Sequence, residues 1–409
     1  GSTRVARDNW DGLAIGAALS GVILTVGENV CGMDREAEIV DGRVRRSPDL
    51  ERRVRLYQEW SRGHGTIAVQ ANVEDTRLGV LEYAIEELGV EAVELKWGQG
   101  AKDIGGEVKI PSLEHALELK ARGYIVLPDP EDPTVQEAFK AGAFKEFERH
   151  SRVGMVEEES FHRRVQQLRR VGAKYVFLKT GAYRPADLAR AVKWASDARI
   201  DLLTLDGAGG GTGMSPWRMM NEWGIPTVYL ESLLVSYLDR LAARKAYLPP
   251  VAMAGGFALE DQVFKGLALG APYVKAIGVA RAPLTAVLVG KTVGRMLAQG
   301  KVPPEWAKYG DQVEQVFVAA HRLRSTLGKD FAKVPPAAIG LVSYFDRLAQ
   351  GLRQFMCGAR KFRVDLLDRD DLVALTHEAA QVTGVRYVME ADAGEVEEIL
   401  SGRAVSLAG

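Results

Sequence analysis

One loop of this chain is almost free of side chains. The segment TLDGAGGGTGMSP, residues 204–216, follows an apolar, β-branched run and is itself rich in glycine. Without side chains, such a loop can bring its backbone amides against a flat or phosphorylated ligand. Glycine loops also serve as plain tight turns, and the segment alone leaves both interpretations open. Its glycines are Gly207, Gly209, Gly210, Gly211 and Gly213.

Several lysines stand where strands are expected to end. Lys179 closes the run YVFLKTG, where an ammonium group can neutralise an anionic ligand, including the N1–C2=O edge of a reduced flavin. The segment LKWGQGAKDIGG carries Lys96, Gln99 and Lys102 among its glycines. Two ammonium groups and an amide suit a substrate with one or two carboxylates. Lysines at a barrel rim or in a solvated loop are the alternative.

A second glycine cluster predicts a phosphate site. Gly255 and Gly256 follow the run VAMA and precede a helix-periodic segment, 259–269, and Gly278 ends the next strand-like run. Free amides and the positive end of a helix attract phosphate, and barrels often bind phosphate after their last two strands. Without neighbouring motifs, the same glycines would be read as two turns.

Polar side chains mark two further strand ends. Glu28, in VGENVCG, is a carboxylate among glycines that could orient an amine or a lysine, or could be a surface residue. Gln70 and Asn72 alternate near the end of AVQANV. Their amides could bind the edge of a flavin or of a substrate, or simply end the strand.

Composition excludes several classes of protein. The formal net charge is −1, so no basic excess points to nucleic acid. The apolar stretches are too short and too interrupted by glycine to predict a membrane span. No signal peptide is recognisable, and we expect a cytoplasmic protein.

Metal and nucleotide motifs are also missing from the sequence. Its six histidines show no metal-ligand spacing, so we predict no metal site. Two cysteines, Cys31 and Cys357, exclude a disulfide framework and a cysteine-ligated iron–sulfur cluster within this sequence, and we expect both to be small buried residues. No dinucleotide fingerprint of the Rossmann type is present.

The elements that must position these residues alternate along the chain. Apolar strand-like runs lie between amphipathic helical segments, which predicts a parallel sheet covered by helices. The predicted strands are 22–26, 66–73, 92–97, 175–180, 200–207, 226–230, 250–256 and 273–278. The predicted helices are 48–62, 76–89, 112–122, 157–171, 186–197, 231–245, 259–269 and 281–298.

About eight such units favour an α/β fold of the (β/α)8 TIM-barrel type, with its site at the carboxyl ends of the strands. The chain opens with a loop and a helix over 1–21. We therefore expect either a complete barrel, one whose first strand is missing from this chain, or one with only seven strands of its own. Helical patterns continue over 305–356, 369–383 and 393–402. We therefore divide the chain into a barrel, residues 1–300, and a helical extension packed on it, residues 301–409.

These motifs together resemble the FMN-binding synthase domain of glutamate synthase. The family's KxxQGAKPGxGG is similar to Lys96–Gly106, its VKL to Phe177–Lys179, and its NTGEGG to Val26–Gly32. Its SGHDGGTGASP is similar to Asp206–Pro216, and its GGLRTGxDVxxAxALGA and GxA to Gly255–Ala271 and Gly278–Ala280. The motifs occur in the family's order between about residues 10 and 295.

The resemblance implies an FMN barrel that reduces 2-iminoglutarate, formed from 2-oxoglutarate and ammonia, to glutamate. It places Lys179 near the flavin N1 edge, with Gln99, Lys102 and Glu28 at the flavin or the substrate. The implied catalytic residues are these four. The residues implied to bind FMN are Gln70, Lys96, Lys179, Gly209, Gly210, Gly211, Gly255, Gly256, Gly278 and Ala280.

The sequence also departs from the family. Ala208 and Gly209 replace its His-Asp pair, and no amidotransferase domain is present in the sequence. We therefore expect separate amidotransferase and electron-transfer subunits, and an oligomer. The alternatives are an enzyme that makes or splits an N-substituted glutamate, and a noncatalytic barrel subunit that binds flavin or a metabolite.

Overall fold

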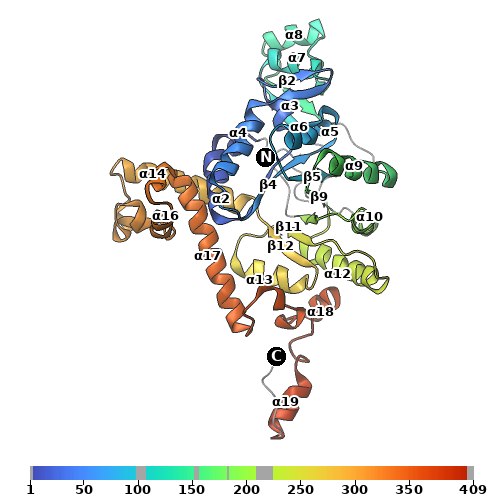
Figure 1. Ribbon diagram of the computed structural model, residues 1–409, viewed down its shortest axis with the longest axis vertical. Coiled ribbons are helices and arrows are strands. Elements are labelled where there is room, and N and C mark those ends of the chain that lie inside the picture. Colours follow the sequence, from blue (N-terminus) through green and yellow to red (C-terminus); the bar gives the residue numbers. More distant parts are fainter. Residues whose placement is uncertain (1–2, 98–106, 152–155, 182–183, 209–223, 403–409) are drawn as a thin grey trace.

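The computed structural model describes residues 3–97, 107–151, 156–181, 184–208 and 224–402. Its centre is a sheet of seven parallel strands with helices packed around it (Figure 1). The strands follow one another in chain order, so every crossover moves in one direction, as in a TIM barrel and unlike a doubly wound sheet. In that order they are β1 (Ile23–Val26), β4 (Thr66–Ala71), β5 (Ala92–Lys96), β9 (Tyr175–Gly181), β10 (Leu202–Asp206), β11 (Val251–Ala254) and β12 (Val274–Gly278).

The sheet is open between its two edge strands. Within the described ranges no ladder joins β12 to β1, and Ile23 on β1 is 47% exposed. The predicted α/β barrel is confirmed, with a sheet that has seven strands among the described residues, one fewer than the usual eight. The outer face of the sheet carries Val69, Val93 and Leu178 into the main hydrophobic core beneath the helices.

Amphipathic helices follow most strands and bury one face on the sheet. In α4, Ser47 accepts a hydrogen bond from the Leu50 amide, and Pro48 occupies the first turn, which is the usual start of a helix. The helices around the sheet are α1 (Arg4–Asp8), α2 (Trp10–Ser20), α3 (Val30–Met33), α4 (Pro48–Trp60), α5 (Val73–Leu78), α6 (Val80–Glu86), α9 (Glu158–Val171), α10 (Pro185–Asp197), α12 (Thr227–Ala243), α13 (Glu260–Leu269) and α14 (Arg281–Ala298).

One predicted strand is wrong. Residues 226–230 were expected to be extended because PTVYL is β-branched and aromatic, but Thr227 begins α12. Leu230, Leu234 and Leu238 are fully buried at intervals of four, so the helical period that continues beyond this segment outweighs its local composition.

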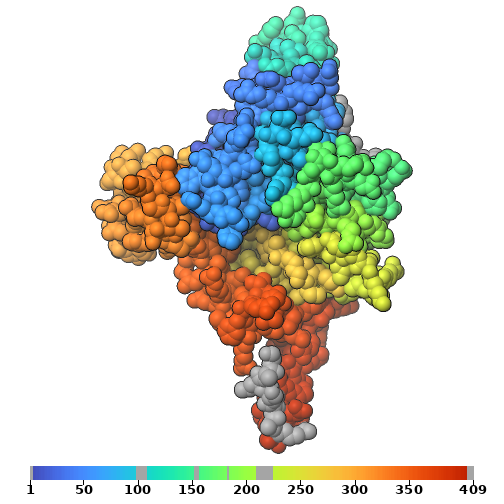
Figure 2. Space-filling view, viewed as in Figure 1, coloured from blue at the N-terminus to red at the C-terminus, as the bar shows by residue number. Residues whose placement is uncertain are grey.

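A small lobe interrupts the barrel between β5 and α9. It holds a three-stranded antiparallel sheet in the order β6–β8–β7, which the sequence analysis did not predict. In Figures 1 and 2 this lobe and the β2–β3 hairpin form the upper end of the molecule. The elements are β2 (Glu38–Val40), β3 (Arg43–Arg46), β6 (Glu107–Ile110), α7 (Leu113–Ala121), β7 (Ile125–Leu127), α8 (Pro133–Lys140) and β8 (Phe147–His150).

The chain after residue 300 is helical, as predicted. Its long helix α17 packs along α2 and α14, where Ala337 and Leu341 form a buried cluster with Val287. The division at residue 300 stays a prediction. The elements are η2 (Pro304–Tyr309), α15 (Val313–Val316), α16 (Ala320–Leu327), η3 (Gly328–Lys333), α17 (Pro336–Gly358), η4 (Val364–Leu366), η5 (Arg369–Asp371), α18 (His377–Thr383) and α19 (Ala393–Leu400).

The sequence also led to expectations about membrane spans and about the two cysteines. In the described part of the chain, no helix combines the length and the apolarity needed to cross a membrane. Cys31 is buried as expected, whereas Cys357 is exposed near the end of α17. The expectation that both thiols are buried is therefore wrong for Cys357.

We predict that glycine at position 340 is required for the docking of α17. A Cβ at Gly340 would lie 2.8 Å from the Ala286 carbonyl oxygen and 2.9 Å from the Gly290 Cα. Gly340→Ala should lower the free energy of unfolding by about 1–3 kcal/mol, because the backbones of two helices must separate. Urea titration measures this value.

The matched control is Gly358→Ala, at the end of the same helix. A Cβ there would meet no atom within 4 Å. This variant should change stability by less than about 1 kcal/mol. Equal losses in the two variants would contradict close helix contact as the cause.

Candidate functional site

Polar side chains line the inner face of the sheet at the carboxyl ends of its strands. Register partners in a parallel sheet point to the same face. Gln70 pairs with Glu94, Lys96 pairs with Lys179, and Lys179 pairs with Thr204. One layer deeper, the inner face is apolar, with Ala68, Ala92 and Phe177 in a separate cluster. Together with Asp206, these side chains form the inner polar row: Gln70, Glu94, Lys96, Lys179, Thr204 and Asp206.

Two ion pairs hold the lysines of this row. Lys96 Nζ lies 2.9 Å from Glu28 Oε2, and both side chains are almost fully buried. Lys179 Nζ lies 3.1 Å from Asp206 Oδ2, and 24% of the Lys179 side chain is exposed. Glu28 comes from the loop after β1, so the Lys96–Glu28 pair joins this loop to β5. The Lys179–Asp206 pair joins β9 to β10. Lys179 is the more accessible of the two ammonium groups.

Glu94 lies between the lysines on the same face. Its Oε1 accepts a hydrogen bond from Gln70 Nε2 at 2.5 Å, and its Oε2 accepts one from Thr204 Oγ1 at 3.5 Å. Burial raises the pKa of Glu94, while Lys179 and the Gln70 hydrogen bond act in the opposite direction. This carboxyl is therefore held by neutral donors and is easier to protonate than an exposed glutamate.

The two lysines differ in their proton affinity. Burial lowers the pKa of Lys96, and the neighbouring Lys179 ammonium adds to this effect, although Glu28 opposes it. Burial also lowers the pKa of Lys179, but Asp206 and Glu94 outweigh burial and raise the pKa above its ordinary value. Lys179 is therefore a firmly charged cation at the edge of the row, where an anionic ligand could reach it.

The loop that carries Glu28 is fixed by a buried network. Asp75 Oδ2 accepts a hydrogen bond from the Asn29 amide at 2.8 Å, and Asn72 Nδ2 donates to Asn29 Oδ1 at 3.2 Å. Asn29 adopts a positive φ of 69°, which few residues other than glycine tolerate. Burial raises the pKa of Asp75 to about 7, and the Glu28 carboxylate adds to this rise. Asn72 thus positions a loop rather than lining the inner row.

The predicted phosphate glycines lie together at the ends of β11 and β12. Ala254 pairs with Gly278, and Gly255 and Gly256 follow β11 with φ of 115° and 97°. A Cβ at Gly255 would lie 2.7 Å from the Gly207 amide nitrogen, whereas one at Gly256 would meet open space. This turn brings bare backbone to the edge of the site, as phosphate binding requires.

Two amides just before α13 are already occupied. Ala258 N and Leu259 N both donate to Gln262 Oε1. The first turn of α13 also holds Glu260 and Asp261, which repel an anion. The next helix, α14, has no acidic residue in its first turn and follows Ala280, so its start suits a phosphate better.

The structure thus brings together Glu28, Gln70, Lys96 and Lys179, and separately Gly255, Gly256, Gly278 and Ala280. The sequence analysis missed Glu94, Thr204 and Asp206 as members of the row. Their positions at alternate residues of two predicted strands were the available signal. The predicted residues that lie outside the described residues are Gln99, Lys102, Gly209, Gly210 and Gly211.

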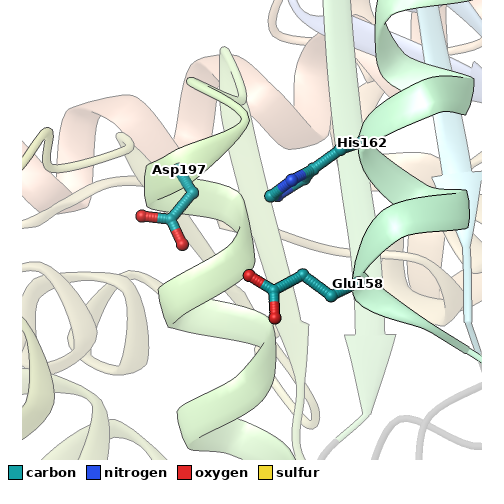
Figure 3. A group of neighbouring side chains, drawn as sticks. All are labelled: Glu158, His162 and Asp197. Atoms are coloured by element: carbon teal, nitrogen blue, oxygen red, sulfur yellow. The ribbon is translucent and has the colours of Figure 1, made fainter.

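A second group of titratable side chains lies on the outer helices. Ligand atoms of Glu158, His162 and Asp197 are within 4.8 Å of one another, and the three side chains face one another at the corners of a triangle (Figure 3). The search for metal-ligand spacing did not find this group because Asp197 comes from a different helix. Glu158 and Asp197 are exposed, and Asp197 is already paired with the Lys193 ammonium, which competes with any cation.

Comparison with solved structures returns matches at low identity and low TM-score. A lactate oxidase from Pediococcus acidilactici is 13% identical over 88% of this chain and 68% of its own, with a TM-score of 0.42. A FabK mutant from Thermotoga maritima is 11% identical over 88% and 93%, with a TM-score of 0.40. A mandelate oxidase mutant with an FMN adduct is 15% identical over 84% and 72%, with a TM-score of 0.36. No sequence among curated proteins matches this chain.

Residues 149–293 match the family described as the conserved region in glutamate synthase. The matched segment contains Lys179, Asp206, Gly255, Gly256 and Gly278, and so includes one ion pair of the inner polar row and the glycine turn. The match confirms the resemblance to glutamate synthase over this segment of the chain.

We predict that Glu28→Gln destabilises the protein. The substitution keeps the shape of the side chain but leaves the buried Lys96 ammonium without its carboxylate, which costs about 3–5 kcal/mol. Urea unfolding at pH 7 measures the loss. The control is Glu91→Gln, whose partner Lys174 is more than half exposed and whose loss should leave stability unchanged. A Glu28→Gln protein as stable as wild type would contradict the importance of the buried pair.

We also predict a pH dependence from Asp75. Its carboxyl has an ordinary pKa of 3.8 when unfolded and about 7 when folded, so between these values the folded protein holds the extra proton. Rising pH therefore destabilises the fold across this window, by up to about 4 kcal/mol. Asp75→Asn should weaken this dependence of the free energy of unfolding on pH. Urea titrations of wild type and variant from pH 4 to 8 measure the difference. The same pH dependence in both proteins would contradict a role of Asp75.

Proposed function

We propose that this chain is an FMN-dependent oxidoreductase that reduces 2-iminoglutarate, from 2-oxoglutarate and ammonia, to glutamate. The observation that carries the proposal is that Lys179, a firmly charged ammonium, and the bare glycine turn at β11 and β12 lie at the carboxyl ends of strands in one sheet, with β10 between β9 and β11. Both lie within the segment that matches glutamate synthase. The cation suits a flavin edge and the turn suits a phosphate.

The residues present fit FMN on two grounds. The turn at Gly255 and Gly256 has positive φ at both residues and open space beside Gly256, so backbone amides can approach a phosphate closely. The start of α14, next to Gly278, adds a positive helix end without acidic side chains. Gly255, Gly256, Gly278 and Ala280 would hold the phosphate, and Lys179 and Gln70 would meet the ring.

The chain's own residues would then bind and orient the substrate. When bound and reduced, FMN supplies a hydride to an imine carbon and is itself oxidised. Lys179 balances the negative charge of the ring edge. Lys96 holds a proton at Nζ beside Glu28, and its lowered pKa suits transfer of a proton toward the substrate nitrogen. Gln99 and Lys102 are proposed to bind the substrate carboxylates.

A noncatalytic flavin- or metabolite-binding subunit is the second candidate. The open edge between β12 and β1, among the described residues, favours it, because a barrel that is not closed shields its ligand poorly from water. Under either candidate we propose separate amidotransferase and electron-donor subunits, an oligomer, and a cytoplasmic location. An enzyme acting on an N-substituted glutamate remains a variant of the first proposal.

The decisive experiment is anaerobic reduction of the FMN-loaded protein followed by addition of 2-oxoglutarate and ammonium chloride. The proposal expects reoxidation of the flavin, recorded by absorbance, with formation of glutamate. Bound flavin that is reoxidised no faster than in buffer, across a panel of 2-oxo acids, would support the noncatalytic subunit. Absence of FMN binding would overturn both.

We predict that Lys179→Met keeps FMN binding within a few-fold but lowers the flavin reduction potential. Without the ammonium, the anionic reduced ring loses its neighbouring charge, and reoxidation by substrate should change by about 100-fold. Spectroelectrochemistry measures the potential. The control is Lys193→Met on the outer helix α10, which should leave both the potential and the rate unchanged. An unaltered potential in Lys179→Met would contradict its place at the ring.

A further inference from the structure

Four buried side chains beside the Glu28 loop carry polar atoms without hydrogen-bond partners. Asn29 and Arg149 are 0% exposed, Asp75 is 1% exposed and Tyr124 is 4% exposed. The atoms without partners are Asn29 Nδ2, Asp75 Oδ1, the Tyr124 hydroxyl, and Arg149 Nε and Nη2. Buried polar atoms are almost always paired, and leaving one unpaired costs about 1–3 kcal/mol, more for a charged group.

These side chains are neighbours, although they come from distant parts of the chain. The Arg149 guanidinium carbon lies 4.8 Å from the centre of the Tyr124 ring. A Cβ on Gly32, three residues after Asn29, would overlap the Tyr124 hydroxyl. Asn29 in turn donates its backbone amide to Asp75 at 2.8 Å. The group therefore fills the junction between the loop after β1 and the small three-stranded sheet.

Arg149 lies on the apolar face of the small sheet. In β8, Phe147 and Arg149 are buried, whereas Glu148 and His150 between and after them point outward. The register partners of Arg149 are Val108 and Val126. Burying a guanidinium among apolar residues costs free energy unless its donors find partners.

Of the carboxylates near Arg149, Glu74 and Glu28 have other partners, whereas Asp75 Oδ1 has none. Glu74 is paired with Arg77 at 3.3 Å, and Glu28 with Lys96 at 2.9 Å. Arg149 donates from Nη1 to the Ser151 hydroxyl at 2.7 Å. Its remaining edge, formed by Nε and Nη2, has the spacing and direction that match the two oxygens of a carboxylate.

We propose that Arg149, Tyr124 and Asn29 form a buried binding site for a carboxylate group. Arg149 donates to both carboxylate oxygens from Nε and Nη2, and the Tyr124 hydroxyl and Asn29 Nδ2 supply further hydrogen bonds. Because Asn29 adjoins Glu28, the carboxylate is that of a small dicarboxylate whose other end faces the inner polar row. This last identification rests on the proposed function, whereas the binding of a carboxylate does not.

The test is equilibrium binding to the purified full-length chain, without turnover. Calorimetry and thermal shifts are recorded with glutarate, 2-oxoglutarate, butyrate and inorganic phosphate. The proposal expects binding of the carboxylates. Tighter binding of phosphate than of any carboxylate would overturn the assignment of the ligand.

Three variants locate the site. Arg149→Met should weaken glutarate binding by about 10- to 100-fold, because it removes both guanidinium donors to the carboxylate. Tyr124→Phe, which removes only an unpaired hydroxyl, should weaken glutarate binding by about 3- to 10-fold. The matched control, Arg164→Met, breaks a pair with Glu82 at 3.0 Å elsewhere and should leave binding unchanged.

Two outcomes would overturn the proposal. One is equal glutarate affinity in wild type and both site variants. The other is a crystal structure grown with glutarate in which Arg149 Nε and Nη2 contact ordered water only. Failure of flavin reoxidation would leave this binding result untouched, so the two proposals fail separately.

Discussion

The inner polar row depends on the burial of two ammonium groups on adjacent strands. Lys96 and Lys179 are register partners across β5 and β9, so their charges repel within a poorly solvated interior. Glu28 offsets one charge from the β1 side, Asp206 the other from β10, and Glu94 lies between them. This neutralisation requires the observed strand order, because the carboxylates reach the lysines from neighbouring strands and loops. The chemistry of the row therefore depends on the winding of the barrel.

The side chains of the row also differ in proton affinity and exposure between its interior and its edge. Glu94 is held by the neutral groups Gln70 and Thr204, and burial raises its pKa, so a proton there is easily tolerated. With that proton in place, two ammonium groups face two carboxylates. Lys179 is the partly exposed member and keeps its charge, so an incoming anion meets a cation first. The row is thereby suited to ligands that carry negative charge.

The sequence predicted the strands well because a fully buried parallel strand is a short apolar run, and the polar residue that ends it stands out. Glu28, Lys96 and Lys179 were found in this way. Glu94 was not, although it stands two residues before Lys96 and therefore on the same face of the strand. The strand predicted over 226–230 was wrong because five residues are too few to distinguish a strand from the first turn of a helix.

The small lobe between β5 and α9 contacts the loop after β1, which carries Glu28. Arg122 donates from Nη1 to the carbonyls of Gly32 and Asp34, which ties the lobe to the loop after β1. The two-residue period of β8 then turns Arg149 toward that same loop, while its neighbours in the strand face outward. A strand in any other register would send the guanidinium to solvent. The alternation of β8 therefore brings the buried Arg149 to the loop that carries Glu28, where we propose that it binds a carboxylate.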